Sequence, residues 1–366
     1  MKKVIKSRKK VVAVIVLIAV VCLIFVVGGL SIYGKIQMGK IPDLTFTDAL
    51  EYTTHNNPEA VITVGIIKNG KSSYKVYGEN GKELPTELHT YEIGSLTKTF
   101  TAALINKAVH EEKVSMTDTI DCYLALPEGN GYPTIEELLT HTSGYKGYYF
   151  ESPMIGNYFR GRNDFCGISK EMVLNKVKSL DMEQDRYDFN YSNFGYAVLG
   201  LVLESVYETN YTTLLNDFAQ NELGLFATHV SDQSGDLGHY WDWNAEDAYI
   251  AAGAITSNIE DMLKYAQIQM EDDSYIQGCH TALKSIDAST DSYKTMGICM
   301  DEIGMAWIID KENGFVWHNG GTGDYNCYLG FNPESGDAVV ILSNLSPDYR
   351  IPSTVLGVKL LSKISD

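Results

Sequence analysis

Residues 95–98 read Ser95-Leu96-Thr97-Lys98, and they stand where a strand-forming pattern gives way to a helical one. Before them, residues 61–67 predict a buried strand, and Asn69-Gly70 is a strong hairpin-turn signal ahead of a second strand over 73–77. From 98 to 108, apolar side chains recur at steps of three and four, as they do on the buried face of a helix. This part of the chain therefore predicts a β-hairpin followed by a helix.

The same two patterns organise the rest of the chain. Further helices are predicted over 46–54, 135–139, 170–180, 194–206, 211–222, 259–270 and, at the end, 353–364. Four strand-like runs, at 304–309, 315–318, 325–331 and 337–342, have short connections typical of an antiparallel meander. We therefore predict an α+β fold, an α/β sandwich. One antiparallel sheet combines the first two strands with the last four, N- and C-terminal helices flank it, and a mostly helical subdomain of about residues 100–270 is inserted.

The N-terminus has the pattern of a membrane anchor. Six of the first ten residues are basic, and residues 11–32 then contain no charged side chain. A helix rises ~1.5 Å per residue, so about 20 residues cross a hydrocarbon core of ~30 Å. We expect a cytoplasmic segment (1–10), a transmembrane signal anchor (11–32), a stalk (33–44) and an extracytoplasmic domain (45–366), in a single-pass plasma-membrane protein. A cleaved signal peptide is the alternative, and a lipoprotein anchored at Cys22 is disfavoured because Val21 stands where a small residue is needed.

Charge and cysteine content exclude several classes of function. The chain has 29 Lys+Arg and 47 Asp+Glu; without the first 35 residues, which hold seven basic groups and no acidic one, it carries about −25. A nucleic-acid partner is therefore not expected. The five cysteines beyond Cys22 have no metal-ligand spacing and cannot all pair, so we expect mostly small buried side chains and at most two disulfides. No metal or organic cofactor is expected, and the oligomeric state stays open.

The tetrad 95–98 has the form S-x-x-K. Residues three apart on a helix share a face, so the Lys98 amine can reach the Ser95 hydroxyl and take its proton if burial lowers the pKa of the lysine. The helix N-terminus adds free backbone N–H groups beside the serine. Three other copies begin at Ser7, Ser72 and Ser143, but only Ser95 is predicted to open a helix.

Two later motifs supply further polar groups. Tyr191 and Asn193, in a loop before the helix at 194, offer a proton-transfer group and an amide-recognition group; a buried tyrosine with a capping asparagine would give the same pattern. His318 ends a predicted strand, and Gly320 lets a substrate approach the backbone while the N–H of Gly321 can donate. A glycine-rich hairpin turn is the alternative for that segment.

The three motifs together are far more specific than any one of them. In the order S-x-x-K, Y-x-N, H-x-G, the chain resembles the serine β-lactamase and penicillin-binding-protein superfamily, specifically its class C β-lactamase, DD-peptidase and esterase branch, over about residues 45–360. The stretches 91–98, 138–144, 252–257 with Asp261, and 339–344 look like that branch too.

The resemblance implies a role for each motif residue. Ser95 would attack a carbonyl to give an acyl-enzyme, and Lys98 and Tyr191 would share the proton transfers. The backbone N–H groups of Ser95 and Gly321 would form the oxyanion hole. Asn193 would bind a substrate amide. His318 stands where many relatives have lysine, near the leaving group or the substrate carboxylate.

The expected function is that of a membrane-anchored extracytoplasmic serine hydrolase acting on an amide or ester. The histidine at 318 holds a carboxylate less strongly than lysine does, which favours peptidase or esterase chemistry over a true β-lactamase. The alternatives are a D-alanyl-D-alanine carboxypeptidase, an esterase or weak β-lactamase, and a penicillin- or peptide-binding sensor without turnover. His141 is expected to be structural, while Tyr240, Trp241 and Trp243 could line the substrate groove or pack a loop.

Overall fold

The computed structural model of the chain describes residues 39–182, 187–271 and 275–365. It divides into two units, Met1–Thr45 and Phe46–Asp366. In the first, the described part contains one 3₁₀ turn, η1 (Ile41–Asp43). The predicted segment 1–10, the predicted anchor 11–32 and the first half of the predicted stalk (33–38) lie outside the described residues. Within the described ranges, no helix has both the length and the apolar composition that a membrane span requires.

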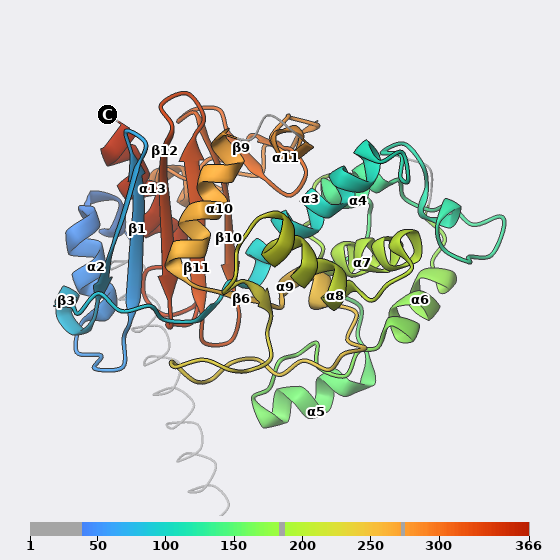
Figure 1. Cartoon of the computed structure of the whole chain (residues 1–366), viewed down its shortest axis with the longest axis horizontal. Helices are drawn as coiled ribbons and strands as arrows, with labels where there is room; N and C mark the ends of the chain where they lie inside the picture. The colour runs from blue at the N-terminus through green and yellow to red at the C-terminus, as the bar shows by residue number, and fades with distance from the viewer. Residues whose placement is uncertain (1–38, 183–186, 272–274, 366) are drawn as a thin grey trace, which may run out of the picture. The chain divides into compact units, whose positions relative to one another are not determined.

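A nine-stranded antiparallel sheet forms one side of the second unit (Figure 1). Its strands, in spatial order, are β3 (Glu83–Leu84), β2 (Lys71–Tyr77), β1 (Ile62–Lys68), β12 (Asp337–Ser343), β11 (Asn326–Asn332), β10 (Phe315–Gly321), β9 (Ile308–Asp310), β8 (Glu302–Ile303) and β7 (Lys284–Ser285). β1 pairs with β12, with Ile62 opposite Ser343, so the two ends of the domain meet at the centre of the sheet. This confirms the predicted sheet built from early and late strands.

Helices cover both faces of the sheet. α10 (Ile259–Glu271) lies in front of the strands in Figure 1, while α13 (Ser353–Ser365) packs behind β11 and β12 and contacts α2 (Phe46–Thr54). All seven residues of β12 are buried, because both of its faces are covered. The α+β class is therefore confirmed, with N- and C-terminal helices on one face.

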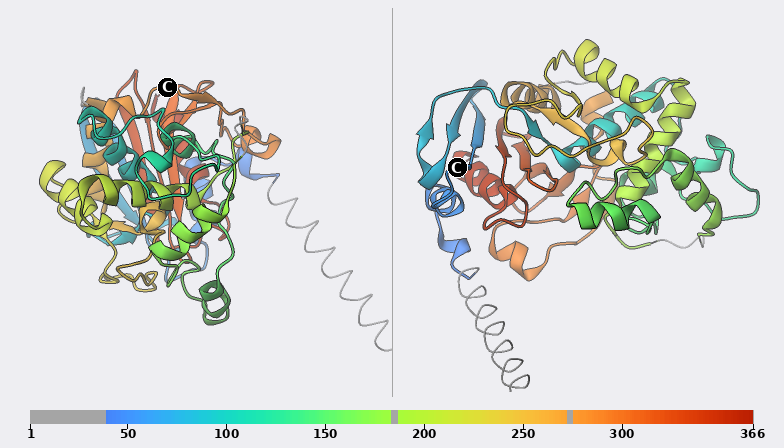
Figure 2. Two further views of the ribbon diagram at one scale, coloured as in Figure 1. Left: turned by 90° about the vertical axis from the view of Figure 1, so that its right-hand side faces the viewer. Right: turned by 90° about the horizontal axis from the view of Figure 1, so that it is seen from below.

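The helical lobe lies between β4 and β6 in the sequence. It contains α3 (Thr97–His110), α4 (Ile135–Leu139), α5 (Ser152–Arg160), α6 (Lys170–Ser179), α7 (Asn193–Tyr207), α8 (Tyr211–Asp217) with the π turn η5 (Phe218–Glu222), and α9 (Ile250–Gly253). α3, α7 and α9 contact one another and bury the apolar sides of Phe100, Leu104 and Val198. Figure 2 shows this lobe from the side and from below.

A small sheet connects the lobe to the large one. It is formed by β4 (Tyr91–Glu92), β6 (Ile255–Ser257) and β5 (His229–Val230). The remaining elements are short: η2 (Glu79–Gly81), η3 (Gly94–Leu96), η4 (Ile120–Cys122), α11 (Tyr275–Gly278) and α12 (Asp291–Thr295). β4 leads directly into η3, so this small sheet fixes the start of the S-x-x-K segment.

Most predicted elements match the structure within a few residues, but two predictions were wrong. The strand expected over 304–309 begins only at Ile308, because Gly304 and Trp307 close a turn (N···O 2.9 Å) and Ala306 has a positive φ of 70°. The set of predicted helices was also incomplete, because it does not include α5. The aromatic side chains of α5 are largely exposed. The helix therefore lacks the regular spacing of buried apolar residues from which a helix is predicted.

The cysteines behave as expected. Cys122, Cys166, Cys279, Cys299 and Cys327 are all free thiols, and all except Cys122 are buried. Within the described residues they therefore act as small apolar side chains and form no disulfide.

Candidate active site

The S-x-x-K segment begins at the tight turn between β4 and α3. Gly94 has a φ of +49°, and Ser95 follows it in η3, two residues before α3 starts at Thr97. Lys98 lies in the first turn of α3, and its Nζ is 3.1 Å from the Oγ of Ser95. The structure thus brings the predicted nucleophile and base into hydrogen-bond contact.

Lys98 is fully buried, and every polar atom it binds is uncharged. Its Nζ lies 2.7 Å from Oδ1 of Asn193 and 2.6 Å from the carbonyl oxygen of Ala252, in addition to Ser95. Burial holds the pKa of Lys98 well below its usual 10.5. A neutral amine has two N–H bonds and one lone pair. The two carbonyl oxygens can only accept, so they take the N–H bonds and leave the lone pair for the hydroxyl proton of Ser95.

The Tyr191 motif completes the helical side of the site. Ser192 is the N-cap of α7 and accepts the N–H of Gly195 (2.9 Å), so Asn193 is the first residue of the helix and not part of the loop that we predicted. The ring centroid of Tyr191 is 5.0 Å from Nζ of Lys98, and the phenol hydrogen-bonds to Ser95. Tyr191 is 38% exposed as a whole residue, but desolvation of its phenol raises its pKa, so the phenol keeps its proton at neutral pH.

His141 holds this motif in place. Its Nδ1 accepts the N–H of Ser192 (3.0 Å), and its carbonyl oxygen accepts the N–H of Asn190 (2.8 Å). The side chain is 1% exposed, and burial lowers its pKa well below the usual 6.5. Its ring packs against that of Tyr191, with 4.4 Å between centroids. His141 therefore positions Tyr191, which agrees with the structural role expected for it.

The glycines at the end of β10 provide the opposite wall. Thr322 donates its N–H to the carbonyl of Tyr325 (2.9 Å), and hydrogen-bonded pairs alternate along an antiparallel ladder. Gly321 faces Asn326 in the next, non-hydrogen-bonded position, so its N–H points away from β11. On the side of β10 away from β11, the neighbouring strand β9 pairs only with residues 315–317, so Gly321 is not paired with β9.

The turn that carries Ser95 fills the space beside the end of β10. A Cβ on Gly94 would lie 2.6 Å from the nitrogen of Gly321. A Cβ on Gly320 would collide with the carbonyl oxygen of Ile93 and lie 2.9 Å from the nitrogen of Ser95. Only glycine fits at this approach. The backbone N–H groups of Ser95 and Gly321 are thereby brought close together.

His318 lies in β10 on the same side of the molecule, 4% exposed. Its Nδ1–H donates to the carbonyl oxygen of Asn319 (2.6 Å), which assigns the neutral tautomer with the other ring nitrogen unprotonated. Its ring centroid is 6.5 Å from that of Tyr191. Burial lowers the pKa of His318 to about 3. His318 is therefore uncharged at neutral pH.

Glu92 is a buried residue of the site region that the motifs did not reveal. It is 3% exposed, and its two oxygens accept the N–H of Trp241 (2.6 Å) and the hydroxyl of Thr322 (2.5 Å). It therefore ties the 231–247 loop to the hairpin that follows Gly321. Burial raises the pKa of Glu92 to about 7. Its position three residues before Ser95 was the only signal in the sequence.

The three aromatic residues proposed for the groove have different roles. Tyr240 stacks on Tyr325 (5.2 Å between centroids) and donates to the carbonyl of Thr90, so it packs the loop. Trp241 lies beside Gly323, since a Cβ there would be 2.8 Å from its Nε1. Trp243 contacts the Trp241 ring edge-on at 6.1 Å. Trp241 therefore lies beside the hairpin that follows Gly321.

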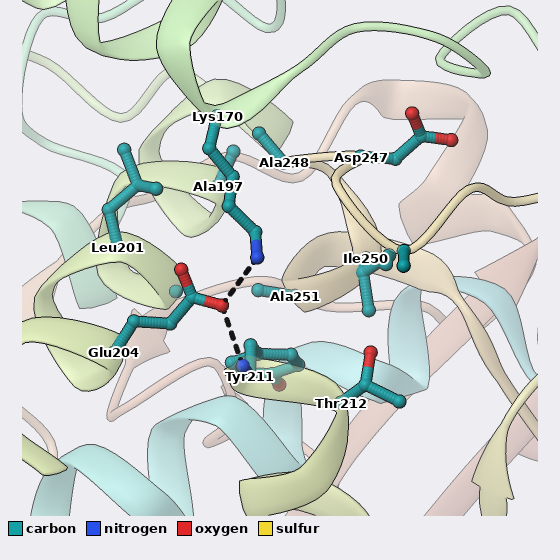
Figure 3. A pocket seen from close by; sticks show the side chains of 12 residues that line it. Lys170, Ala197, Leu201, Glu204, Tyr211, Thr212, Asp247, Ala248, Ile250 and Ala251 are labelled. Atoms are coloured by element: carbon teal, nitrogen blue, oxygen red, sulfur yellow. Dashed lines mark hydrogen bonds and ion pairs between the residues drawn. The ribbon is translucent and has the colours of Figure 1, made fainter. Parts of the chain in front are cut away.

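A pocket between α7, α8 and α9 is shown in Figure 3, away from these motifs. Glu204 lies in it and accepts from Lys170 Nζ (2.8 Å) and from the backbone N–H of Tyr211 (2.6 Å). The free volume is about 10 Å³, about enough for a single water molecule. This pocket thus surrounds an internal ion pair of the helical lobe and has no room for a substrate.

Comparisons with known proteins identify the family of the chain. The sequence model of the Beta-lactamase family matches residues 54–354. Protein flp of Staphylococcus aureus (strain MW2) is 23% identical over 321 residues, covering 79% of this chain and 60% of its own length, so the chain spans less than two thirds of that relative. A beta-lactamase of Pseudomonas fluorescens is 22% identical, covering 78% of this chain and 88% of its own.

Solved structures share the fold. A Beta-lactamase/D-alanine Carboxypeptidase from Yersinia pestis superposes with a TM-score of 0.69 at 20% identity, covering 91% of this chain and 99% of that one. The octameric penicillin-binding protein homologue from Pyrococcus abyssi gives 0.68 at 22% identity, covering 93% and 77%. At these identities the likeness concerns the fold alone.

Proposed function

Because the chain belongs to the beta-lactamase family, we propose that it is a serine hydrolase in which Ser95 forms an acyl-enzyme with an ester or amide substrate. The observation that carries the proposal is the buried amine of Lys98. Two carbonyl oxygens occupy its N–H bonds and its third polar neighbour is the Ser95 hydroxyl, 3.1 Å away. This arrangement makes Lys98 a proton acceptor and Ser95 a nucleophile.

Acylation follows from these positions. As the Ser95 Oγ forms a bond to the substrate carbonyl carbon, its proton passes to Nζ of Lys98. The phenol of Tyr191, protonated and hydrogen-bonded to Ser95, donates a proton to the leaving oxygen or nitrogen as that bond breaks, and recovers one from Lys98. In deacylation water attacks the ester carbon, its proton returns through the same groups, and Ser95 is regenerated.

The backbone supplies the charge stabilisation. Negative charge develops on the carbonyl oxygen in both steps, and the N–H groups of Ser95 and Gly321 form its binding site in our proposal. Asn193, held by Lys98 through its oxygen, contributes its amide N–H₂ to the substrate. No metal or organic cofactor takes part in these steps.

The substrate preference follows from charge. Neither Lys98 nor His318 is positively charged at neutral pH, since burial lowers the pKa of both. A substrate with a carboxylate beside its reacting carbonyl, such as a D-alanyl-D-alanine peptide or a penicillin, therefore gains less here than it would with a lysine at 318. We propose an uncharged ester or amide as the preferred class, with carboxypeptidase activity second.

The location is part of the proposal. The basic residues 1–10 and the uncharged run 11–32 favour a single-pass plasma-membrane protein with the hydrolase domain outside the cytoplasm. Protease treatment of intact cells tests it, because a surface domain is digested while a cytoplasmic protein is not.

Covalent labelling tests the chemistry. The full chain is incubated with a fluorophosphonate and with a fluorescent penicillin, and the modified peptide is mapped. We expect fluorophosphonate on Ser95, and no label in Ser95→Ala. Ser72→Ala is the matched control, because Ser72 also belongs to an S-x-x-K tetrad but is exposed on β2. Absence of both labels from folded wild type, or unchanged labelling in Ser95→Ala, refutes the mechanism; penicillin labelling without ester turnover identifies a non-turnover binder.

A further inference from the structure

Exposed apolar side chains gather in one place on the domain. Ten large apolar side chains are exposed among the described residues, and five of them surround a single cleft on and before α5. These five are Tyr148, Phe150, Ile155, Tyr158 and Phe159, and we call the hollow that they form with Phe165 the aromatic cleft. Phe159 is 82% exposed and Tyr158 76%. Such a concentration on a soluble surface marks a binding site.

One wall of the cleft begins at the Tyr191 motif. Ser192 donates its hydroxyl to the carbonyl of Lys146 (2.7 Å), and Phe194 donates its N–H to the carbonyl of Gly147 (3.0 Å). Tyr148, which lines the cleft, is the next residue. The segment that leads into the cleft is thus hydrogen-bonded directly to the segment that carries Tyr191.

The other wall begins at the hairpin that follows Gly321. Trp241 lies beside Gly323, and its ring contacts that of Phe165 edge-on, with 6.4 Å between centroids. Phe165 stacks on Tyr249 at 4.3 Å and is fixed further by Asn163, whose Nδ2 donates to the carbonyl of Asp242 (3.0 Å). Figure 1 shows α5 beneath the loop that carries Trp241. Both walls therefore start at catalytic segments.

We propose that the aromatic cleft is a substrate subsite that binds an uncharged apolar arm, alkyl or aryl, of the ester or amide attacked by Ser95. This inference rests on the proposed function and names its substrate class. The cleft has a volume of about 360 Å³, within the range of ~300–1,000 Å³ for small-molecule sites. Its lining offers aromatic faces and one carboxylate, Asp164, and no cation.

Charge disfavours the two other occupants of an apolar surface. Residues 36–366 contain 22 basic and 47 acidic groups, so an anionic bilayer repels this domain. Two copies of it repel each other for the same reason. A neutral apolar group meets no such cost and gains by leaving water.

A chain-length series tests the proposal. For the full chain in one fixed detergent, kcat/KM is measured on p-nitrophenyl esters with acyl chains of increasing length, and on acetate esters of alcohols of increasing length. We expect kcat/KM to rise with chain length in one of the two series, by up to about fourfold for each methylene buried. Phe159→Ser and Phe150→Ser should flatten that rise and leave the shortest esters unaffected.

Matched controls keep the result interpretable. Phe226→Ser removes an equally exposed phenylalanine (78%) outside the cleft and should keep the full rise. No rise in either series, or the same rise in Phe159→Ser as in wild type, overturns the subsite. So does a Phe159→Ser effect confined to bilayer binding or dimerisation. Activity on short esters that is lost in Ser95→Ala would still support the proposed function, so the two failures are distinguishable.

Discussion

The helical lobe and the large sheet contribute to the site in different ways. The lobe contributes polar side chains, namely Lys98, Tyr191 and Asn193, and each of them is buried or held by a hydrogen bond. β10 contributes backbone groups at Gly320 and Gly321. There the strand passes so close to the turn of Ser95 that only glycine fits. We therefore expect activity to depend on the chemical identity of these side chains in the lobe, and on the absence of added side-chain volume at these positions in the sheet.

The largest effect is expected from removing the lobe's base. Lys98→Met should lower kcat/KM by at least about 10⁴-fold, because it removes the amine that accepts the Ser95 proton in the proposed mechanism. The free energy of unfolding should not fall, since the variant replaces a desolvated amine with an apolar side chain of similar length. Steady-state kinetics and denaturant titration measure the two quantities. Activity within tenfold of wild type would remove Lys98 from the mechanism.

Added volume on the sheet side should have the next largest effect. Gly320→Ala introduces a methyl group into the space held by the Ile93 carbonyl and the Ser95 nitrogen, so it should displace the proposed oxyanion hole. We expect a loss of about 10²–10³-fold in kcat on a short ester. Gly156→Ala, with nothing within 4 Å of the new methyl, is the control. Circular dichroism separates a displaced site from an unfolded chain, and a folded Gly320→Ala with wild-type kcat contradicts the account.

Glu92 joins the two regions, and its titration should appear in stability. Its folded pKa, about 7, lies above the unfolded value of 4.5, so the carboxyl binds its proton more tightly when folded. This stabilisation is full below pH 4.5 and is lost as pH rises to about 7, with an amplitude on the order of 3 kcal/mol. Glu92→Gln, which cannot ionise, should lack this slope in denaturant titrations across pH 4.5–7. Identical slopes in the two proteins would place the Glu92 titration elsewhere.

The smallest effect concerns the neutral histidine on the sheet. His318→Lys supplies a cation at this place, so turnover should shift toward substrates with a carboxylate. We expect the ratio of kcat/KM for a D-alanyl-D-alanine peptide over a p-nitrophenyl ester to rise about tenfold, the value of one hydrogen bond to a charged group. An unchanged ratio would show that residue 318 does not face the substrate.

The sequence predicted the parts of the fold whose patterns are long or chemically specific. The buried strands β1 and β12 and the buried helix α3 have clear periodicities. Ser95 could be chosen among the S-x-x-K copies because a helical pattern begins there. What it could not supply came from distant contacts. The carbonyl of Ala252, 154 residues after Lys98, sets the orientation of the amine, and Glu92 binds Thr322, 230 residues away.

Exposed elements and very short elements were not predicted from the sequence, for a different reason. α5 presents its aromatic residues to solvent, and a strand of two residues such as β8 has no period to detect. The sequence identified His318 as a candidate residue, but its neutrality depends on its nearly complete burial, which the sequence does not reveal.

The pH dependence of Ser95 labelling tests the central claim most directly, namely that Lys98 is an uncharged base at neutral pH. The rate of fluorophosphonate modification of the full chain is measured from acid to alkaline pH, with Ser95→Ala as the blank. The account predicts that the rate rises as Lys98 loses its proton and reaches a plateau far below its ordinary pKa of 10.5. A rate that keeps rising up to pH 10.5 would mean that Lys98 is charged at neutral pH and would contradict it.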